Sequence, residues 1–185
     1  MKIDDYFDKI ATLWPEPNMS PRRELMDWCM QGVAEHPNSS TLWYDLGVLM
    51  QRCDESYGYK AEDYLRCFEN AIHFNAQDAE AHQELGYVLD IYLSEYERAY
   101  QAFAKAIELG AEHESYCGRA RVLAQMGKTQ EAIDSISENA CRFHKHPAVQ
   151  SLRSEILNGT WDNPGGKKGI VPRSLEKEDN AHEVS

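Results

Sequence analysis

The sequence predicts an all-α fold in which pairs of antiparallel helices stack side by side as a solenoid. The main observation is internal repetition, because residues 65–89 align with residues 100–123 and superimpose Phe68 on Phe103. A Leu-Gly pair also repeats, at Leu46-Gly47 and at Leu85-Gly86. The chain lacks alternating runs of β-branched residues, which would indicate strands. Repetition without strand signals favours stacked helical units.

Each repeated unit has the pattern of two amphipathic helices packed against each other. In residues 41–50, large apolar side chains recur at helical spacing, yet Gly47 lies among them. A glycine inside a helix costs about 1 kcal/mol relative to alanine. We therefore expect a second helix to cross at Gly47 and leave no room for a Cβ. That second helix supplies small residues, since Ala71 and Ala106 each follow a phenylalanine by three positions.

These features resemble the tetratricopeptide repeat (TPR) family, whose first helix carries an aromatic residue, a Leu-Gly pair and a large residue. Its second helix carries a small residue, an aromatic residue and an alanine. The second repeat here supplies Trp43, Leu46, Gly47, Met50, Phe68 and Ala71, and the third supplies Leu85, Gly86, Leu89, Ala99, Phe103 and Ala106. The resemblance covers roughly residues 20–146. It implies a right-handed α-α superhelix of three to four helix-turn-helix repeats plus a C-terminal capping helix.

The chain divides accordingly into a repeat domain, residues 1–159, and a tail. The domain comprises a partial repeat at 1–37, repeats at about 40–77, 78–112 and 113–146, and a capping helix at 146–159. The second helix of the partial repeat is expected to begin at Ser20-Pro21, because an N-cap residue precedes a proline there. Residues 160–185 are expected to be a disordered tail. Trp161 folds back onto the last helix in this interpretation; alternatively, the tail is a short binding motif.

The repeats depart from the family pattern in three places. Several extra residues, around 54–60, lengthen the turn between the two helices of the second repeat, and the third repeat has an extra residue near 93–97. The fourth repeat is degenerate, because Arg119 stands where leucine is usual and Asn139 where alanine is usual. A variant of the family with lengthened inter-helix turns is therefore expected.

Composition and charge restrict the function. The 185 residues are 42% hydrophobic and 27% charged, which suits a folded domain. The formal net charge of −12 opposes binding to nucleic acid or to an anionic membrane and favours a basic or neutral partner. No apolar run is long enough to span a membrane, and the charged N-terminus is unlike a signal peptide. Five scattered cysteines without a CxxC pair predict reduced thiols in a cytoplasmic protein.

In TPR-like solenoids the first helices of successive repeats line a concave groove, so the resemblance implies a binding surface there. The expected groove residues are Tyr44, Val48, Gln51 and Arg52 from the second repeat, Gln83, Tyr87, Asp90 and Ile91 from the third, and Cys117, Arg121 and Gln125 from the fourth, with Thr41, Glu80 and Glu114 beside them. Tyrosine and arginine are enriched at binding hot spots. The hypothesis is a non-catalytic interaction module without a cofactor that binds a peptide or partner protein as an adaptor, assembly factor or inhibitory or immunity partner.

Two alternatives stand beside this hypothesis for the groove: it is a merely solvated helical face, or it is filled by the protein's own tail. A further alternative for the function is a structural self-assembler, in which exposed end repeats stack into a homodimer. Light scattering distinguishes the homodimer from the other two.

The alternative function is a metal-binding enzyme or sensor that uses Cys141, His144 and His146. Thiolate and imidazole suit zinc, but a fourth ligand is missing locally, unless the fold brings Cys117 or His113 close. No GxSxG, HExxH or GxxxxGKS motif is present. We therefore expect a buried cysteine beside surface histidines, and no enzyme.

Overall fold

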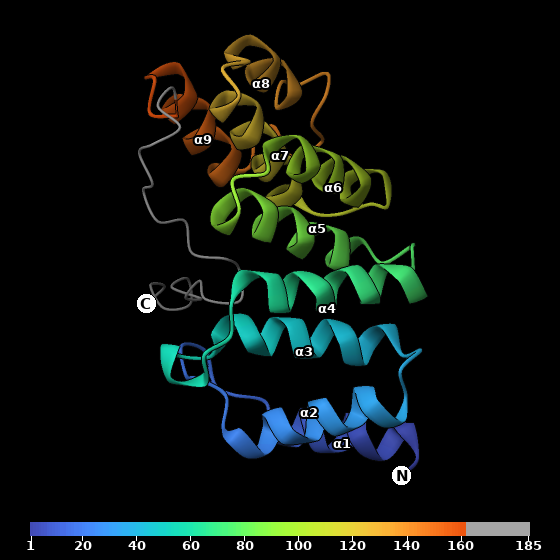
Figure 1. Cartoon of the computed structure of the whole chain (residues 1–185). Coiled ribbons are helices and arrows are strands. Elements are labelled where there is room, and N and C mark those ends of the chain that lie inside the picture. The colour runs from blue at the N-terminus through green and yellow to red at the C-terminus, as the bar shows by residue number, and fades with distance from the viewer. Residues whose placement is uncertain (162–185) are drawn as a thin grey trace, which may run out of the picture.

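In the computed structural model the described residues, 1–161, form an elongated stack of helix pairs (Figure 1). They contain nine α-helices: α1 (Ile3–Leu13), α2 (Arg23–Glu35), α3 (Ser40–Arg52), α4 (Ala61–Phe74), α5 (Ala79–Tyr87), α6 (Tyr96–Glu108), α7 (His113–Gln125), α8 (Thr129–Ser135) and α9 (Pro147–Leu157). A 3-10 helix, η1 (Glu55–Tyr57), follows α3, and a π-helical segment, η2 (Val88–Tyr92), continues α5. No strand occurs within residues 1–161, so the predicted all-α class is confirmed.

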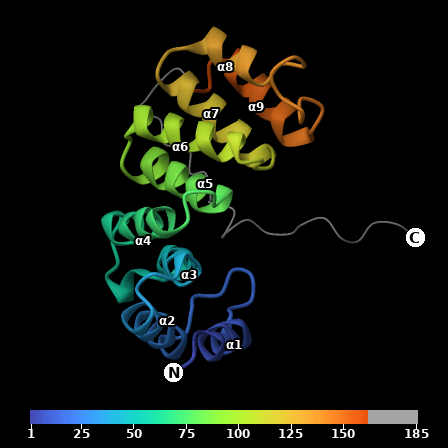
Figure 2. The same ribbon diagram turned by 90° about the vertical axis from the view of Figure 1, so that its right-hand side faces the viewer.

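Helices that are neighbours in sequence are neighbours in space, as a solenoid requires. The most extensive contacts join α3 to α4, α5 to α6 and α6 to α7, and α9 packs on α7 and α8 at the C-terminal end. Figure 2 shows α1 and α3 on one side of the stack and α2 and α4 on the other. The first helices of successive pairs therefore share one face. The limits of the individual repeats stay a prediction.

Side-chain caps explain where several helices begin. The Ser39 side chain accepts a hydrogen bond from the Leu42 N–H at the start of α3, and the Asp78 side chain accepts one from the Ala81 N–H at the start of α5. Pro147 occupies the first turn of α9, where its missing N–H costs nothing. This helix coincides with the capping helix expected at 146–159.

The start of α2 differs from the expectation. The helix begins at Arg23 rather than at Ser20-Pro21, because both residues bind the lengthened turn after α3 instead. The Ser20 hydroxyl accepts a hydrogen bond from the Asp54 N–H at 3.3 Å, and the Pro21 carbonyl accepts one from the Tyr57 hydroxyl at 2.7 Å. The extra residues of the second repeat thus bridge two neighbouring repeats.

Glycine permits the closest approach within the helix pairs. A Cβ at Gly47 would lie 2.8 Å from the Phe68 ring of α4, and a Cβ at Gly86 would lie 2.8 Å from the Phe103 ring of α6. A Cβ at Gly118 of α7 would lie 2.5 Å from the same Phe103 ring, so this ring is held between α5 and α7. The crossing that the sequence predicts at Gly47 is therefore confirmed, and the structure adds a second glycine against Phe103.

The π-helical segment η2 accommodates the extra residue of the third repeat. Its wider turn is closed by a hydrogen bond from the Leu93 N–H to the Val88 carbonyl at 3.3 Å, and Ser94 then adopts a positive φ of 56°. Single π-helical turns insert one residue without breaking a helix and often occur at functional sites. The insertion places Asp90 inside η2, where its side chain is buried.

Trp161 ends the described chain. Its indole N–H donates to the Glu155 carboxylate at 3.2 Å, and its ring packs on the core formed by α7, α8 and α9, so it folds back as expected. The sequence predicts a disordered tail at residues 160–185. Those after Trp161 lie outside the described part of the chain. No helix within residues 1–161 combines the length and apolar character that a membrane span needs.

We predict that Gly47→Ala destabilises the protein by about 1–3 kcal/mol, because the added methyl group overlaps the Phe68 ring. Gly32→Ala is the matched control. There the nearest atoms lie at 3.3 Å and belong to side chains of Leu42 and Tyr6, so the gain in helix propensity offsets most of the contact. Urea unfolding followed by circular dichroism measures both variants. Equal stability of the two variants would contradict the packing role of Gly47.

Candidate functional site

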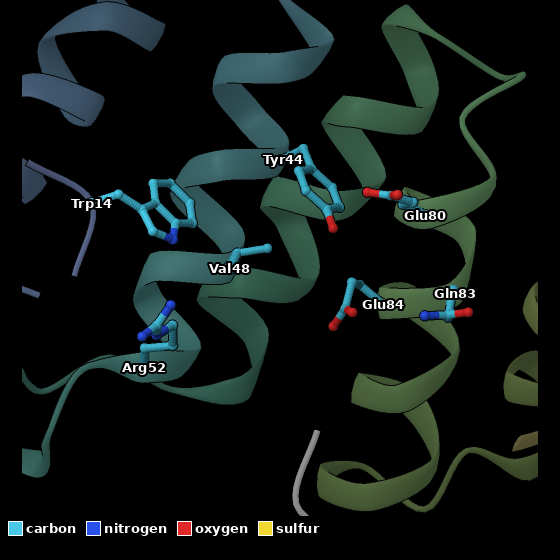
Figure 3. Close-up of a pocket in the computed structure, with 7 residues that line it drawn as sticks. All are labelled: Trp14, Tyr44, Val48, Arg52, Glu80, Gln83 and Glu84. Carbon is cyan, nitrogen blue, oxygen red and sulfur yellow. The ribbon is translucent and has the colours of Figure 1, made fainter. Parts of the chain in front are cut away.

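The candidate site is a groove on the face shared by α1, α3 and α5. One cavity of about 280 Å³ is lined by Trp14, Tyr44, Val48, Arg52, Glu80, Gln83 and Glu84. Figure 3 shows these side chains around one hollow, with Trp14 and Arg52 at one end and the two glutamates at the other. Tyr44, Val48, Arg52 and Gln83 are residues that the sequence predicts for the groove. The structure brings them together.

Tyr44 is held in place by aromatic packing and faces carboxylates. Its ring lies 6.0 Å from the Phe68 ring, which is itself fixed by Gly47. Burial, together with the negative charges of Glu84 and Glu80, raises the pKa of Tyr44. The phenol therefore stays protonated at neutral pH and serves as a hydrogen-bond donor in an acidic environment.

Arg52 connects α3 to the segment that carries Trp14. Its guanidinium donates to the Glu16 carbonyl at 2.9 Å and to the Pro15 carbonyl at 3.5 Å. Burial lowers the pKa of Arg52, since desolvation disfavours the cation. Arg52 thus holds the residues after α1 against the end of α3 and sets the position of the Trp14 ring in the groove.

A second cavity adjoins the first at Trp14. It measures about 470 Å³ and is lined by Phe7, Ile10, Ala11, Trp14 and Asp45. Four of its five lining residues are apolar, so it is suited to an aliphatic or aromatic side chain. We name the two adjoining cavities together the α1–α3–α5 groove.

Asp45 contributes the charged side chain of the second cavity. Burial raises the pKa of its carboxyl to about 6. Neither Asp45 nor Trp14 is among the groove residues expected from the sequence. Phe7, Ile10, Ala11 and Trp14 recur at helical spacing, and this apolar stripe is the signal that could have found Trp14. No such pattern singles out Asp45 within residues 40–52.

The groove residues expected from the third and fourth repeats lie mainly between the repeats. The Asp90 carboxylate accepts two hydrogen bonds from the Arg121 guanidinium, at 2.6 and 2.8 Å, and one from the Gln125 amide at 2.8 Å. Asp90 and Arg121 are both buried, with exposures of 4% and 5%. The Arg121 guanidinium also lies 5.6 Å from the Tyr87 ring and 5.9 Å from the Trp161 ring. Asp90 and Arg121 thus neutralise each other.

The remaining expected residues differ in their surroundings. Gln83 is buried and its side-chain oxygen accepts a hydrogen bond from the Ser115 hydroxyl at 2.7 Å, which joins α5 to α7. Tyr87 donates to the Glu114 carbonyl at 3.3 Å. Gln51 is buried, and within residues 1–161 neither polar atom of its side chain has a hydrogen-bond partner. Ile91 and Cys117 are half-buried.

The residues of the metal alternative make separate contacts. His144 Nδ1 lies 3.1 Å from the Cys141 carbonyl oxygen, whereas the His146 ring stacks on the His113 ring with centroids 3.6 Å apart. Burial raises the pKa of the Cys141 thiol, which opposes the thiolate that a metal needs. Among residues 1–161 no three His, Cys, Asp or Glu side chains are grouped as metal ligands. Nothing in this part of the chain supports the metal alternative.

Comparisons with known proteins agree on the architecture. A thermophilic TPR protein of Thermus thermophilus superimposes with a TM-score of 0.54 and 22% sequence identity, over 75% of this chain and 72% of that one. The MamA protein superimposes with a TM-score of 0.59 and 16% identity, over 86% and 88% of the two chains. No family model and no curated protein matches the sequence. The chain has a TPR-like fold, and the predicted right-handed α-α superhelix is confirmed as its fold class.

We predict that Asp90→Ala lowers stability by about 3–5 kcal/mol, because it leaves the buried Arg121 charge without its carboxylate. Glu69→Ala is the control: it removes an exposed ion pair with Arg98 and costs less than about 1 kcal/mol. The double change Asp90→Leu with Arg121→Met recovers most of the loss, since it removes both charges together. Urea unfolding measures all three variants, and a cost for Asp90→Ala no larger than that for Glu69→Ala would refute the assignment.

We predict that Asp45→Asn stabilises the protein at pH 8 by about 1–2 kcal/mol. The folded-state pKa of about 6 lies above the ordinary value of 3.8, so the folded state carries the cost of a buried charge once the pH rises through 6. At pH 4 the folded carboxyl is already protonated, and the advantage of the asparagine largely disappears. Denaturant unfolding at both pH values tests this, and an advantage that is the same at pH 4 and pH 8 would exclude it.

Proposed function

We propose that this protein is a non-catalytic interaction module that holds a segment of a partner protein in the α1–α3–α5 groove. The observation that carries the proposal is the junction of two cavities at Trp14, one mostly apolar and the other lined by Glu80 and Glu84. The TPR-like fold supports a protein ligand, since a solenoid presents an extended concave surface for binding. Adaptor, assembly factor and inhibitory or immunity partner are the roles that such binding serves.

The chemistry of the groove favours a partner segment that is basic and carries an apolar anchor. The second cavity accepts the anchor between Phe7 and Trp14, and large apolar groups in such pockets dominate binding energies. The carboxylates of Asp45, Glu80 and Glu84 attract lysine or arginine, as does the net charge of −12. The five free cysteines support a reducing compartment such as the cytoplasm.

Selection from a random peptide library displayed on phage tests this proposal. We expect the selected peptides to combine an aromatic or aliphatic anchor with lysine or arginine. Their affinity for Tyr44→Phe/Glu80→Gln should fall at least about ten-fold, which corresponds to ~1.4 kcal/mol. Glu62→Gln, an exposed glutamate in the first turn of α4, is the charge-matched control and should bind like the wild type. Failure to select binders, or binders that do not distinguish the variants, would refute the groove.

A further inference from the structure

The end of the described chain lies against α7, the first helix of the pair that follows α5 and α6. Trp161 is held by Glu155 and stacks near Arg121 of α7, whose carboxylate partner Asp90 continues α5. The α5 helix in turn carries Glu80 and Glu84. The described chain therefore ends one helix pair away from α5 and its two glutamates, with 24 further residues (162–185) in the sequence.

The first part of this segment has the chemistry that the groove favours. Residues 163–174, NPGGKKGIVPRS, contain Lys167, Lys168 and Arg173 and no acidic residue, in a chain whose net charge is −12. Ile170 and Val171 supply adjacent apolar side chains between the cations. This pattern complements an apolar cavity joined to a carboxylate-lined cavity.

The segment is also long enough to reach the groove. Packed helices lie about 10 Å apart, and α5 contacts α7 directly, so Glu80 and Glu84 are on a helix roughly 10 Å from α7. Lys167 lies six positions after Trp161, and six extended residues span up to about 20 Å.

We propose that residues 163–174 bind the α1–α3–α5 groove of the same chain, so that an external basic segment must displace them. The inference rests on the proposed function, because it uses the same groove and the same ligand chemistry. Lys167 and Lys168 face Glu80 and Glu84, and Ile170 and Val171 are the apolar contacts. A tethered segment acts at an effective concentration on the order of millimolar, which weakens a competing ligand without any change in the groove.

A fluorescein-labelled synthetic peptide of residues 163–174 tests the proposal by fluorescence anisotropy on full-length chains. The variant Lys167→Glu/Lys168→Glu/Arg173→Glu should bind the peptide at least about ten-fold more tightly than the wild type, because its own segment no longer competes. The control Lys128→Glu/Lys145→Glu/Lys177→Glu changes the net charge equally outside the segment and should behave like the wild type. Adding Glu80→Gln/Glu84→Gln to the first variant should weaken binding at least about ten-fold.

Equal peptide affinities in the wild type, the tail variant and the control would overturn the proposal, as would binding that is indifferent to Glu80 and Glu84. Carbodiimide cross-linking of mixed ¹⁴N- and ¹⁵N-labelled chains identifies the chain that supplies the segment. Cross-links from Lys167 or Lys168 to Glu80 or Glu84 should carry a single isotope. Mixed-isotope links would show binding to a second copy and would overturn the intramolecular assignment.

The peptides selected by phage display separate this inference from the proposed function. If they bind the groove with equal affinity in the wild type and the tail variant, the intramolecular segment is wrong while the groove function stands. If they bind the tail variant at least about ten-fold more tightly, both hold. If library peptides ignore the groove variants, the proposed function is wrong whatever the tail does.

Discussion

The structure depends on the contact between a glycine and a phenylalanine ring at the centre of its helix pairs. Phe68 covers Gly47 within one pair, and Phe103 is enclosed by Gly86 and Gly118 from two successive pairs. Because close-packed interiors tolerate neither added methyl groups nor voids, these contacts fix the crossing point of the helices. The spacing of the groove-lining helices α3 and α5 follows from them, since each carries one of these glycines opposite the ring.

Polar contacts add a second constraint between the pairs. The buried group of Asp90, Arg121 and Gln125 joins η2 to α7, and Gln83 joins α5 to α7 through Ser115. A buried ion pair adds little net stability, because removing the two charges from water costs most of what their attraction gains. A different arrangement of the third and fourth helix pairs would, however, leave Asp90 or Arg121 buried without its partner. These contacts therefore specify how the third pair meets the fourth. Asp90, Arg121 and Gln125 serve this contact. Tyr44, Val48 and Arg52 of the second repeat instead line the first cavity, together with side chains of α5.

The proposed binding groove thus lies toward the N-terminal half of the solenoid. There Arg52 supports the segment carrying Trp14, and Tyr44 stands between an aromatic core and carboxylates. Asp45 has a pKa near 6 at the edge of an apolar cavity, so its charge at neutral pH opposes folding. A cationic ligand group would relieve that cost, which links the electrostatics of the groove to the basic ligand we propose.

The sequence by itself determined the helical repeats, the tight crossing at Gly47 and the helix after Pro147, because these follow from periodicity, residue size and proline geometry, which act locally. Tertiary structure decided which polar residues of the first helices line a cavity and which contact a neighbouring helix pair. The sequence assigns Arg52 and Arg121 the same place, on the groove face of a first helix. In the structure Arg121 donates to the Asp90 carboxylate, whereas Arg52 donates to backbone carbonyls after α1. Helical spacing identifies which residues share one face of a helix, but only the packing of successive helix pairs decides which residues that face contacts.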